Sequence, residues 1–389
     1  MLTCKKILCA LLACVMLAAV LCTAGCSTPK IAATIDGQEY STGEYLAYLY
    51  SAYAAVYQQY YYTLYYYSYS NLDYWKDLTL SYGEGDAAES VDLAEYIRRT
   101  AQDNMVYIKA LENKLKEFGL SYDEKKKAEL EDSLKDLKNN EYIAFGFNNE
   151  NYKKMAYPSS LAEYSLFYGL YDHNGPRAMS EDEIRAYFDQ NFLSYKLIEL
   201  SLVGADNADM TEEQAKEVTD RLQGYLDAFN ATGKTGADFE AVIKQFNDDQ
   251  KKAAETEDTS ENTTEDTAEN TTEEKEEEQT DSRVDVDATA ASDEDLAKAV
   301  QSVAVGTAKI VQYKKNGTTK TAALIFRMDP TAERADGVDY FADNRENIIS
   351  SAKYKDFRTE MKAYAATLAK SFNKSAVRAC DPKKFDEVK

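Results

Sequence analysis

The chain has 389 residues, a formal charge of −23 at pH 7 and one histidine. So acidic a chain is not expected to bind nucleic acid, because phosphate backbones select basic surfaces. It is also not expected to adhere broadly to an anionic membrane. His173 lies in a turn-forming sequence and leaves little scope for histidine-based catalysis or metal binding, so we expect no cofactor and no metal. Low glycine and proline counts predict a mostly helical protein.

The N-terminus has the pattern of an exported protein. Two lysines precede an uncharged apolar run of 16 residues from Ile7 to Cys22, shorter than the roughly 20 residues of a membrane-spanning helix. Thr23-Ala24-Gly25-Cys26 then resembles the lipobox of bacterial lipoproteins, although Leu or Val is commoner than Thr at its first position. The resemblance implies a signal peptide over residues 1–25 and a lipid on Cys26. An uncleaved membrane anchor is the alternative, and both place the remaining chain outside the cytoplasmic membrane.

Cysteine usage agrees with export. Five of the six cysteines lie in positions 4–26, so the mature chain of 364 residues (389 − 25) keeps Cys26 and Cys380. With Cys26 committed to lipid, Cys380 has no disulfide partner, and no cysteine-based metal or redox site is expected. We expect Cys380 to be an unremarkable residue of a C-terminal tail. A chain of this length is sufficient for two or three domains.

A tyrosine-rich helix follows a predicted hairpin. Residues 31–40 alternate around Asp36-Gly37, a preferred hairpin turn, and Ser41 with Glu44 forms a capping box that starts a helix. Fourteen tyrosines lie between Tyr40 and Tyr74. Because a helix turns only one stripe toward a core, some rings should stay exposed.

Two interpretations of this stretch remain open. The tyrosines form an aromatic segment packed within a helical domain, or they form a surface that contacts other polypeptides, since a tyrosine ring is apolar with a polar tip. The second interpretation selects Tyr61, Tyr62, Tyr65 and Tyr66 as client-binding residues.

The remaining elements follow from periodicity, caps and turn residues. A polar, turn-rich segment is predicted at 72–90 and a turn cluster, a candidate domain boundary, at 172–176. The predicted helices are 91–118, 121–138, 159–171, 184–191, 211–229, 237–246, 293–303 and 338–372. The predicted strands are 192–203, 308–314 and 320–328. A C-terminal tail is predicted over 373–389.

An acidic insert interrupts this order. From Glu255 to Arg283 there are 13 acidic residues against 2 basic ones. With almost nothing apolar to bury, the segment is predicted to be disordered over about 249–284. A solvated spacer and a segment that attracts cations or basic chains are both consistent with this composition.

Several short motifs resemble the PrsA and SurA kind of extracytoplasmic foldase. Glu183–Asn191 (EIRAYFDQN) is similar to the linker helix that enters a parvulin-type prolyl isomerase domain. The segments TGADFEAV from Thr235, FND from Phe246 and LAKAV from Leu296, with Val305-Gly306, are similar to motifs within that domain. The resemblance implies an α+β protein with a mainly helical SurA-N-like chaperone domain and a small parvulin-like α+β domain. The implied map is signal peptide 1–25, anchor and spacer 26–30, helical domain 31–179 with 335–389, and parvulin-like domain 180–334.

The isomerase motif is degenerate. The family has a histidine on its first strand, where this chain has Glu199, and a second near residues 322–325, where it has none. Rotation about an X-Pro amide needs no nucleophile or metal, only a dry pocket that favours the twisted amide. No other catalytic motif is present.

We therefore expect a membrane-anchored foldase or chaperone for unfolded exported polypeptides, with weak or no isomerase activity. An active parvulin-type isomerase, with Glu199 as its doubtful catalytic residue, and a non-catalytic surface-binding lipoprotein are the alternatives.

The anchor is tested by Cys26→Ser. Without the thiol there is no atom to acylate, so the variant should take up no labelled fatty acid and should be unprocessed or released from membranes. Metabolic labelling and fractionation measure both effects. Unchanged acylation and membrane retention would rule the anchor out.

Overall fold

The computed structural model describes residues 29–83, 85–137, 142–204, 208–258, 282–332, 334 and 337–386. The predicted signal peptide, Cys26 and most of the acidic insert lie outside these residues. The fold is α+β and divides into two compact units. Unit 1 runs to Arg177 and resumes at Lys355, and unit 2 runs from Ala178 to Tyr354. The second boundary therefore lies at 355 rather than at the 335 expected from the sequence.

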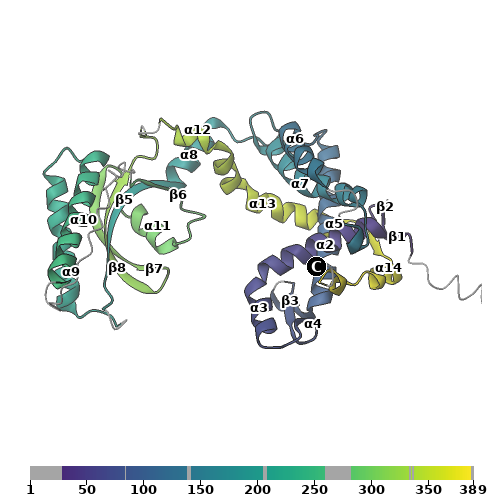
Figure 1. The fold of residues 1–389 in the computed structure, drawn as a ribbon. Coiled ribbons are helices and arrows are strands. Elements are labelled where there is room, and N and C mark those ends of the chain that lie inside the picture. Colours follow the sequence, from purple (N-terminus) through teal and green to yellow (C-terminus); the bar gives the residue numbers. More distant parts are fainter. Residues whose placement is uncertain are drawn as a thin grey trace, which may run out of the picture. The chain divides into compact units, whose positions relative to one another are not determined.

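Unit 1 is mainly helical (Figure 1). Its elements are β1 (Ile31–Ile35), β2 (Gln38–Ser41), α2 (Thr42–Gln59), α3 (Tyr61–Tyr69), α4 (Tyr74–Asp77), β3 (Thr79–Tyr82), β4 (Glu89–Asp92), α5 (Leu93–Glu117), α6 (Glu124–Ser133), α7 (Asn149–Tyr171), the C-terminal part of α13 (Arg345–Thr367), β9 (Lys370–Phe372), α14 (Lys374–Ala379) and the 3-10 helix η4 (Pro382–Phe385). Helices α2, α5 and α7 pack together around fully buried side chains such as Tyr45, Ile97 and Leu166.

Several predictions for unit 1 are confirmed. The hairpin turns at Asp36 and Gly37, which both have positive φ, and the predicted capping box of Ser41 and Glu44 opens α2. The segment 72–90, predicted as irregular, instead contains α4 and the β3–β4 hairpin. In Figure 1, α3, α4 and β3 lie together at one end of this unit, away from α6 and α7.

Two predictions for the C-terminal segment are wrong: the helix expected over 338–372 ends earlier, and residues 373–386 of the expected tail are structured. Helix α13 ends at Thr367, and β9 then pairs with β1 to give a sheet of order β2-β1-β9. After β9 the chain forms α14 and η4, and Cys380 between them is 3% exposed. Burial raises the pKa of its thiol to about 11. The strand was missed because three residues carry no periodic signal of their own and are specified only by their partner.

Unit 2 is a four-stranded antiparallel sheet covered by helices on both faces. Its elements are α8 (Glu181–Asn191), β5 (Phe192–Ser201), α9 (Glu212–Asn230), α10 (Gly236–Asp258), β6 (Val284–Asp287), α11 (Glu294–Gln301), β7 (Thr307–Lys315), β8 (Thr319–Met328) and α12 (Tyr340–Asp343). The strand order is β6-β5-β8-β7, so β5 and β8 are the two inner strands, and β6 is a strand that the sequence did not indicate.

Successive side chains along β5 point to opposite faces of the sheet, so each face has its own apolar residues and its own covering helices. Ile198 and Leu202 join the core beneath α9 and α10. Leu193 and Tyr195 join the core beneath α11. Figure 1 shows α9 and α10 on one side of the sheet and α11 on the other.

Helix α10 is longer than predicted. It was expected to end at residue 246, with disorder from about 249, yet it runs to Asp258. Asp249 accepts a hydrogen bond of 2.9 Å from the Tyr225 hydroxyl on α9, which fixes the first turn beyond the expected end. The Gln, Lys and Ala residues that follow are good helix formers, and they outweigh the low hydrophobicity on which the disorder prediction rested.

Buried polar contacts fix the chain where it re-enters the fold after the insert. The Ser282 hydroxyl donates to Glu240 on α10 at 2.7 Å, and Glu240 also pairs with the buried Lys196. Next to it, Arg283 and Asp285 form an ion pair of 3.0 Å with side chains 3% and 9% exposed. We name Ser194, Arg283, Asp285 and Arg334 the re-entry cluster; Ser194 and Arg334 both contact Asp285.

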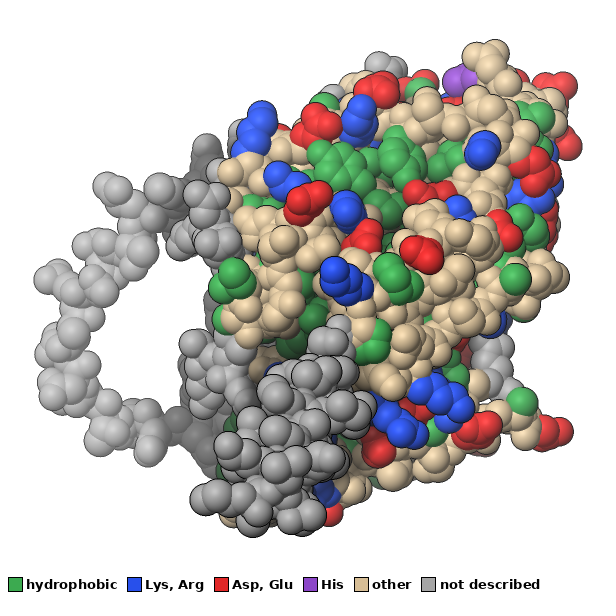
Figure 2. Space-filling model, turned by 90° about the vertical axis from the view of Figure 1, so that its right-hand side faces the viewer, with side chains coloured by type: hydrophobic (Ala, Val, Ile, Leu, Met, Phe, Trp, Pro, Cys, Tyr) green, Lys and Arg blue, Asp and Glu red, His purple; other side chains and the backbone are tan. Residues whose placement is uncertain are grey.

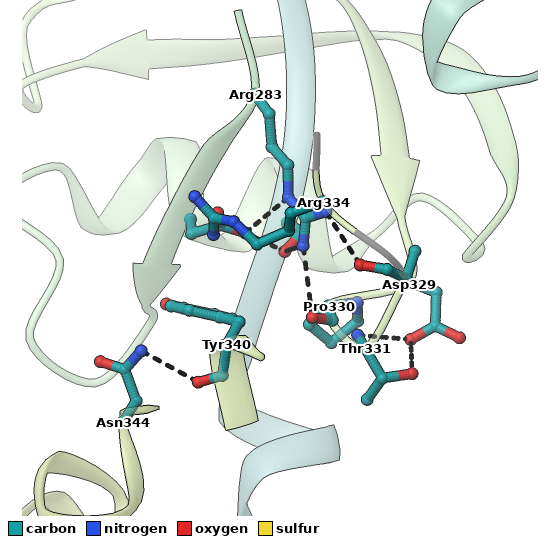
Figure 3. Close-up of polar contacts among 10 residues, drawn as sticks. Arg283, Asp329, Pro330, Thr331, Arg334, Tyr340 and Asn344 are labelled. Carbon is teal, nitrogen blue, oxygen red and sulfur yellow. Dashed lines mark hydrogen bonds and ion pairs between the residues drawn. The ribbon is translucent and has the colours of Figure 1, made fainter. Parts of the chain in front are cut away.

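Figure 3 shows how this cluster holds the following loop. The Arg283 guanidinium donates to the carbonyl oxygens of Pro330 at 3.2 Å and Ala332 at 3.3 Å. Arg334 lies over the Tyr340 ring, 5.6 Å from its centroid. Arginine can satisfy several acceptors at once because its guanidinium presents five donors in a fixed plane. The strand β6 and the loop after β8 are therefore tied to one buried group.

The geometry of the insert ends makes a stability prediction. From Glu240 to Asp258, α10 rises by about 27 Å, while Ser282 is bonded back at Glu240. About 8 extended residues span that distance. Replacing residues 259–281 by a twelve-residue Gly/Ser linker should therefore change the melting temperature by only a few degrees, since loop length alone costs about 0.6 kcal/mol per doubling.

Joining Asp258 directly to Ser282 provides the contrast. That deletion cannot span the distance without unravelling α10 or breaking the Ser282–Glu240 bond, so it should lower the melting temperature clearly, as followed by circular dichroism. A large loss of stability in the linker variant would show instead that residues 259–281 pack against the unit.

Candidate functional site

Helix α3 presents a row of exposed tyrosine rings. Helix α2 ends at Gln59, the chain bends at Tyr60, and α3 continues with one buried residue, Leu64. The exposed rings, which we name the tyrosine face, are Tyr61 (52% exposed), Tyr62 (84%), Tyr65 (61%), Tyr66 (63%) and Tyr69 (78%).

These five rings share one side of the helix. At about 100° per residue they fall within an arc of about 140°, and Leu64 lies outside it. Tyr61, Tyr65 and Tyr69 form a ladder in which successive ring centroids are 6.4 Å apart and the planes differ by 20° and 21°. Offset ring pairs of this kind stabilise each other, so the face is an ordered surface rather than a set of independent side chains.

The two interpretations of the tyrosine-rich stretch apply to different halves of it. In α2, Tyr45 and Tyr48 are buried in the helical core at 0% and 4% exposure. In α3 five of the six rings are exposed, which confirms the prediction that the helix cannot bury all of them. Client binding by Tyr61, Tyr62, Tyr65 and Tyr66 remains a prediction.

The tyrosine face carries no charge. No Asp, Glu, Lys, Arg or His lies between Glu44 and Asp73. By contrast, the face of the molecule drawn in Figure 2 shows acidic, basic and hydrophobic side chains interspersed. An uncharged patch of aromatic rings on an acidic protein is the kind of surface that marks a contact with another molecule.

A pocket of about 420 Å³ is lined in part by residues that follow α3 in the sequence. It is lined by Leu72, Asp73, Tyr74, Trp75, Lys383 and Asp386, and we name it the Trp75 pocket. The Asp386 carboxylate accepts hydrogen bonds from the Tyr53 hydroxyl, from the Tyr74 hydroxyl at 2.6 Å and from the Trp75 indole N–H at 2.7 Å. Burial, and then the hydrogen bond to Asp386, raise the pKa of Tyr53 and of Tyr74, so both hydroxyls remain donors.

Sequence reasoning missed this pocket. Tyr53 and Asp386 are 333 residues apart, and Asp386 was assigned to the tail. Trp75 is the single tryptophan of the chain, in a segment predicted to be irregular. A lone tryptophan beside turn residues was the one available signal.

Glu199 lies in unit 2, on the face of β5 that α11 covers. It faces Ala323 across β8, accepts a hydrogen bond from the Tyr313 hydroxyl and forms an ion pair of 2.7 Å with Lys315. Lys315 thus neutralises the carboxylate and Tyr313 donates a hydrogen bond to it, both from β7. On the last strand, residues 322–325 are fully buried aliphatic side chains. Both polar partners of Glu199 thus belong to the sheet itself. A catalytic role for Glu199 stays a prediction.

Within the described ranges, no helix is long and apolar enough to cross a bilayer. The same ranges hold no group of three or more acidic, histidine or cysteine side chains arranged to bind a metal ion. Cys26 lies outside the described residues.

Chemical modification tests the exposure of the tyrosine face. Tetranitromethane nitrates accessible rings, so Tyr62 and Tyr69 should be among the first tyrosines modified, and Tyr45 and Tyr48 among the last. Peptide mapping by mass spectrometry gives the rate at each ring, and the urea-unfolded chain, in which the rates should become similar, is the control. Slow nitration throughout α3 would mean that another surface covers these rings.

Comparison with known proteins finds likeness among solved structures only. No protein-family model matches the chain, and no curated protein matches it. Among solved structures, the foldase protein PrsA from Streptococcus pneumoniae is 13% identical with a TM-score of 0.27, and the match covers 79% of this chain and 93% of that one. A TM-score this low does not establish a shared fold or function. The function of this chain is therefore inferred from its own residues.

Proposed function

We propose that this protein is a foldase or chaperone that binds unfolded exported polypeptides on its tyrosine face, tethered by a lipid on Cys26 to the outer face of the cytoplasmic membrane. Prolyl isomerase activity is weak or absent in this proposal. The single observation that carries the proposal is the tyrosine face on α3, with five rings each more than half exposed.

The chemistry of the face suits unfolded clients. An unfolded chain presents apolar side chains and unpaired backbone groups together, in no fixed order. Tyrosine offers a flat apolar ring for the first and a hydroxyl for the second, at a low cost in side-chain entropy. A surface made of one residue type discriminates little between sequences, which is what a chaperone with many clients requires.

The packing of α3 also supports this assignment. Its only buried side chain is Leu64, so most of the helix makes no contribution to the core. Burying a large aromatic side chain stabilises a fold by about 1.5–3 kcal/mol. Helix α3 leaves five such side chains largely exposed to water. The cost of that exposure is recovered when a client covers the rings.

The geometry of Glu199 argues against robust isomerisation. A group that polarises a twisted amide must be directed at the substrate in a dry pocket. Glu199 is directed at Tyr313 and Lys315, and no histidine occupies either position that the family resemblance implies.

A four-site variant tests the proposal. Replacing Tyr61, Tyr62, Tyr65 and Tyr66 with Ser should reduce suppression of client aggregation several-fold, measured by light scattering after dilution of a chemically unfolded protein. The fold should persist, because exposed substitutions each change stability by about 0.5 kcal/mol or less. The matched variant with Phe at the same positions keeps the rings and should retain most of the activity.

Glu199→Ala is the second control. It removes an ion pair with a partly exposed Lys315, so it should leave aggregation suppression unchanged. The reverse pattern, with harmless tyrosine replacements and a damaging Glu199→Ala change, would contradict the proposal and place the working site in unit 2. A prolyl isomerisation assay on the same proteins would then be expected to show activity.

A further inference from the structure

We infer that the Trp75 pocket is a binding site for a cationic side chain, arginine or lysine, of a polypeptide segment held on the tyrosine face. This inference rests on the proposed function for the identity of the ligand as a polypeptide. The pocket itself is argued from Asp386, Trp75 and Lys383.

Within the part of the chain that the structure describes, the charge on Asp386 has no cationic partner. Its three hydrogen-bond donors, from Tyr53, Tyr74 and Trp75, are all neutral groups. Among the described residues no Lys, Arg or His forms an ion pair with it. The other carboxylate of the pocket, Asp73, is paired with Lys76 at 2.6 Å. Asp386 is therefore a fixed, partly buried acceptor whose charge is left for a ligand to neutralise.

Three neutral donors hold this carboxylate in place without using all of it. A carboxylate has about four lone-pair sites, and the donors account for three. The unused site is on Oδ1, because Tyr74 and Trp75 both donate to Oδ2, and Asp386 is one of the residues that line the pocket. A guanidinium or ammonium group that reached this site would form a charge-assisted hydrogen bond, the stronger kind.

The aromatic wall favours the same ligand. A cation within about 6 Å of a ring centroid is attracted by the ring face, most strongly by tryptophan. Lys383 already uses this wall, with its Nζ 6.0 Å from the centroid of Trp75. Tyr53 stacks beside the indole, with planes 8° apart and centroids 6.5 Å apart. The chain's own lysine thus shows which chemical group the wall accepts.

Position connects the pocket to the tyrosine face. Tyr69 ends α3, and Leu72, the first pocket residue, is 45% exposed only three residues later. Helices α3 and α4 contact each other, so the helix that carries the tyrosine face lies next to a helix that lines the pocket. A segment lying across the rings would place a neighbouring side chain at the pocket. The preferred client segment is therefore aromatic or aliphatic, followed by a basic residue.

The single tryptophan makes the pocket directly observable. Emission excited at 295 nm comes from Trp75 alone, since the chain has one tryptophan. Two acetylated and amidated hexapeptides ending in Phe-Leu-Gly-Arg and Phe-Leu-Gly-citrulline differ only in charge, because citrulline has the shape of arginine with a neutral urea. With the mature chain, the arginine peptide should change Trp75 emission and bind about tenfold more tightly than its twin.

Two variants separate the charge from the fold. Asp386→Asn should reduce the arginine peptide to the affinity of the citrulline peptide, and its melting temperature shows whether the three donors still hold the site. Lys383→Gln removes the competing internal cation without touching those hydrogen bonds, so it should tighten the arginine peptide several-fold. Equal affinity of both peptides for the native chain and for Lys383→Gln would overturn the inference.

The outcomes also distinguish this inference from the proposed function. Serine at Tyr61 and Tyr65 should weaken both peptides equally and leave the arginine preference intact. If those variants bind both peptides as well as the native chain and still prefer arginine, the cation pocket stands and the tyrosine face fails. If they weaken both peptides but no preference for arginine exists, the face stands and the pocket fails.

Discussion

The pairing of β9 with β1 is the contact on which the arrangement of unit 1 depends. It joins residues 33–35 to residues 370–372 and so returns the C-terminal segment to the first strand of the fold. From β9, α14 and η4 bring Phe385 against Tyr50 and Tyr53 of α2, with centroids 5.5 and 5.4 Å apart. The next residue, Asp386, then meets Trp75. A three-residue strand thereby assembles a site from α2, α4 and the C-terminus.

Local signals in the sequence predicted the elements that depend on local chemistry. Ser41 with Glu44 forms the capping box expected of it, and Asp36-Gly37 turns the β1–β2 hairpin with positive φ at both residues. The errors fall where a distant partner decides the structure. Strands β6 and β9 have four and three residues and exist because β5 and β1 offer edges to pair with.

The candidate sites divide in the same way. Exposure of the α3 rings followed from the helical period, since one stripe cannot bury them all. The Trp75 pocket did not, because no local pattern relates Tyr53 or Trp75 to Asp386 more than 300 residues away. Glu199 was placed correctly on the first strand of the sheet, but its partners Tyr313 and Lys315 come from a strand that is not its neighbour. Side-chain partners across a sheet were beyond a reading of spacing and periodicity.

Because of the re-entry cluster, the acidic insert can change in evolution without disturbing the sheet. Because Ser282, Arg283 and Asp285 are bonded to α10, β5 and the loop after β8, the register of β6 is set locally and not by the length of chain that precedes it. Mutations that lengthen or recompose residues 259–281, or shorten them to no fewer than about 8 residues, would meet little selection from folding. Such a position can accumulate charge, or accept a whole inserted domain, while the sheet beside it stays constant.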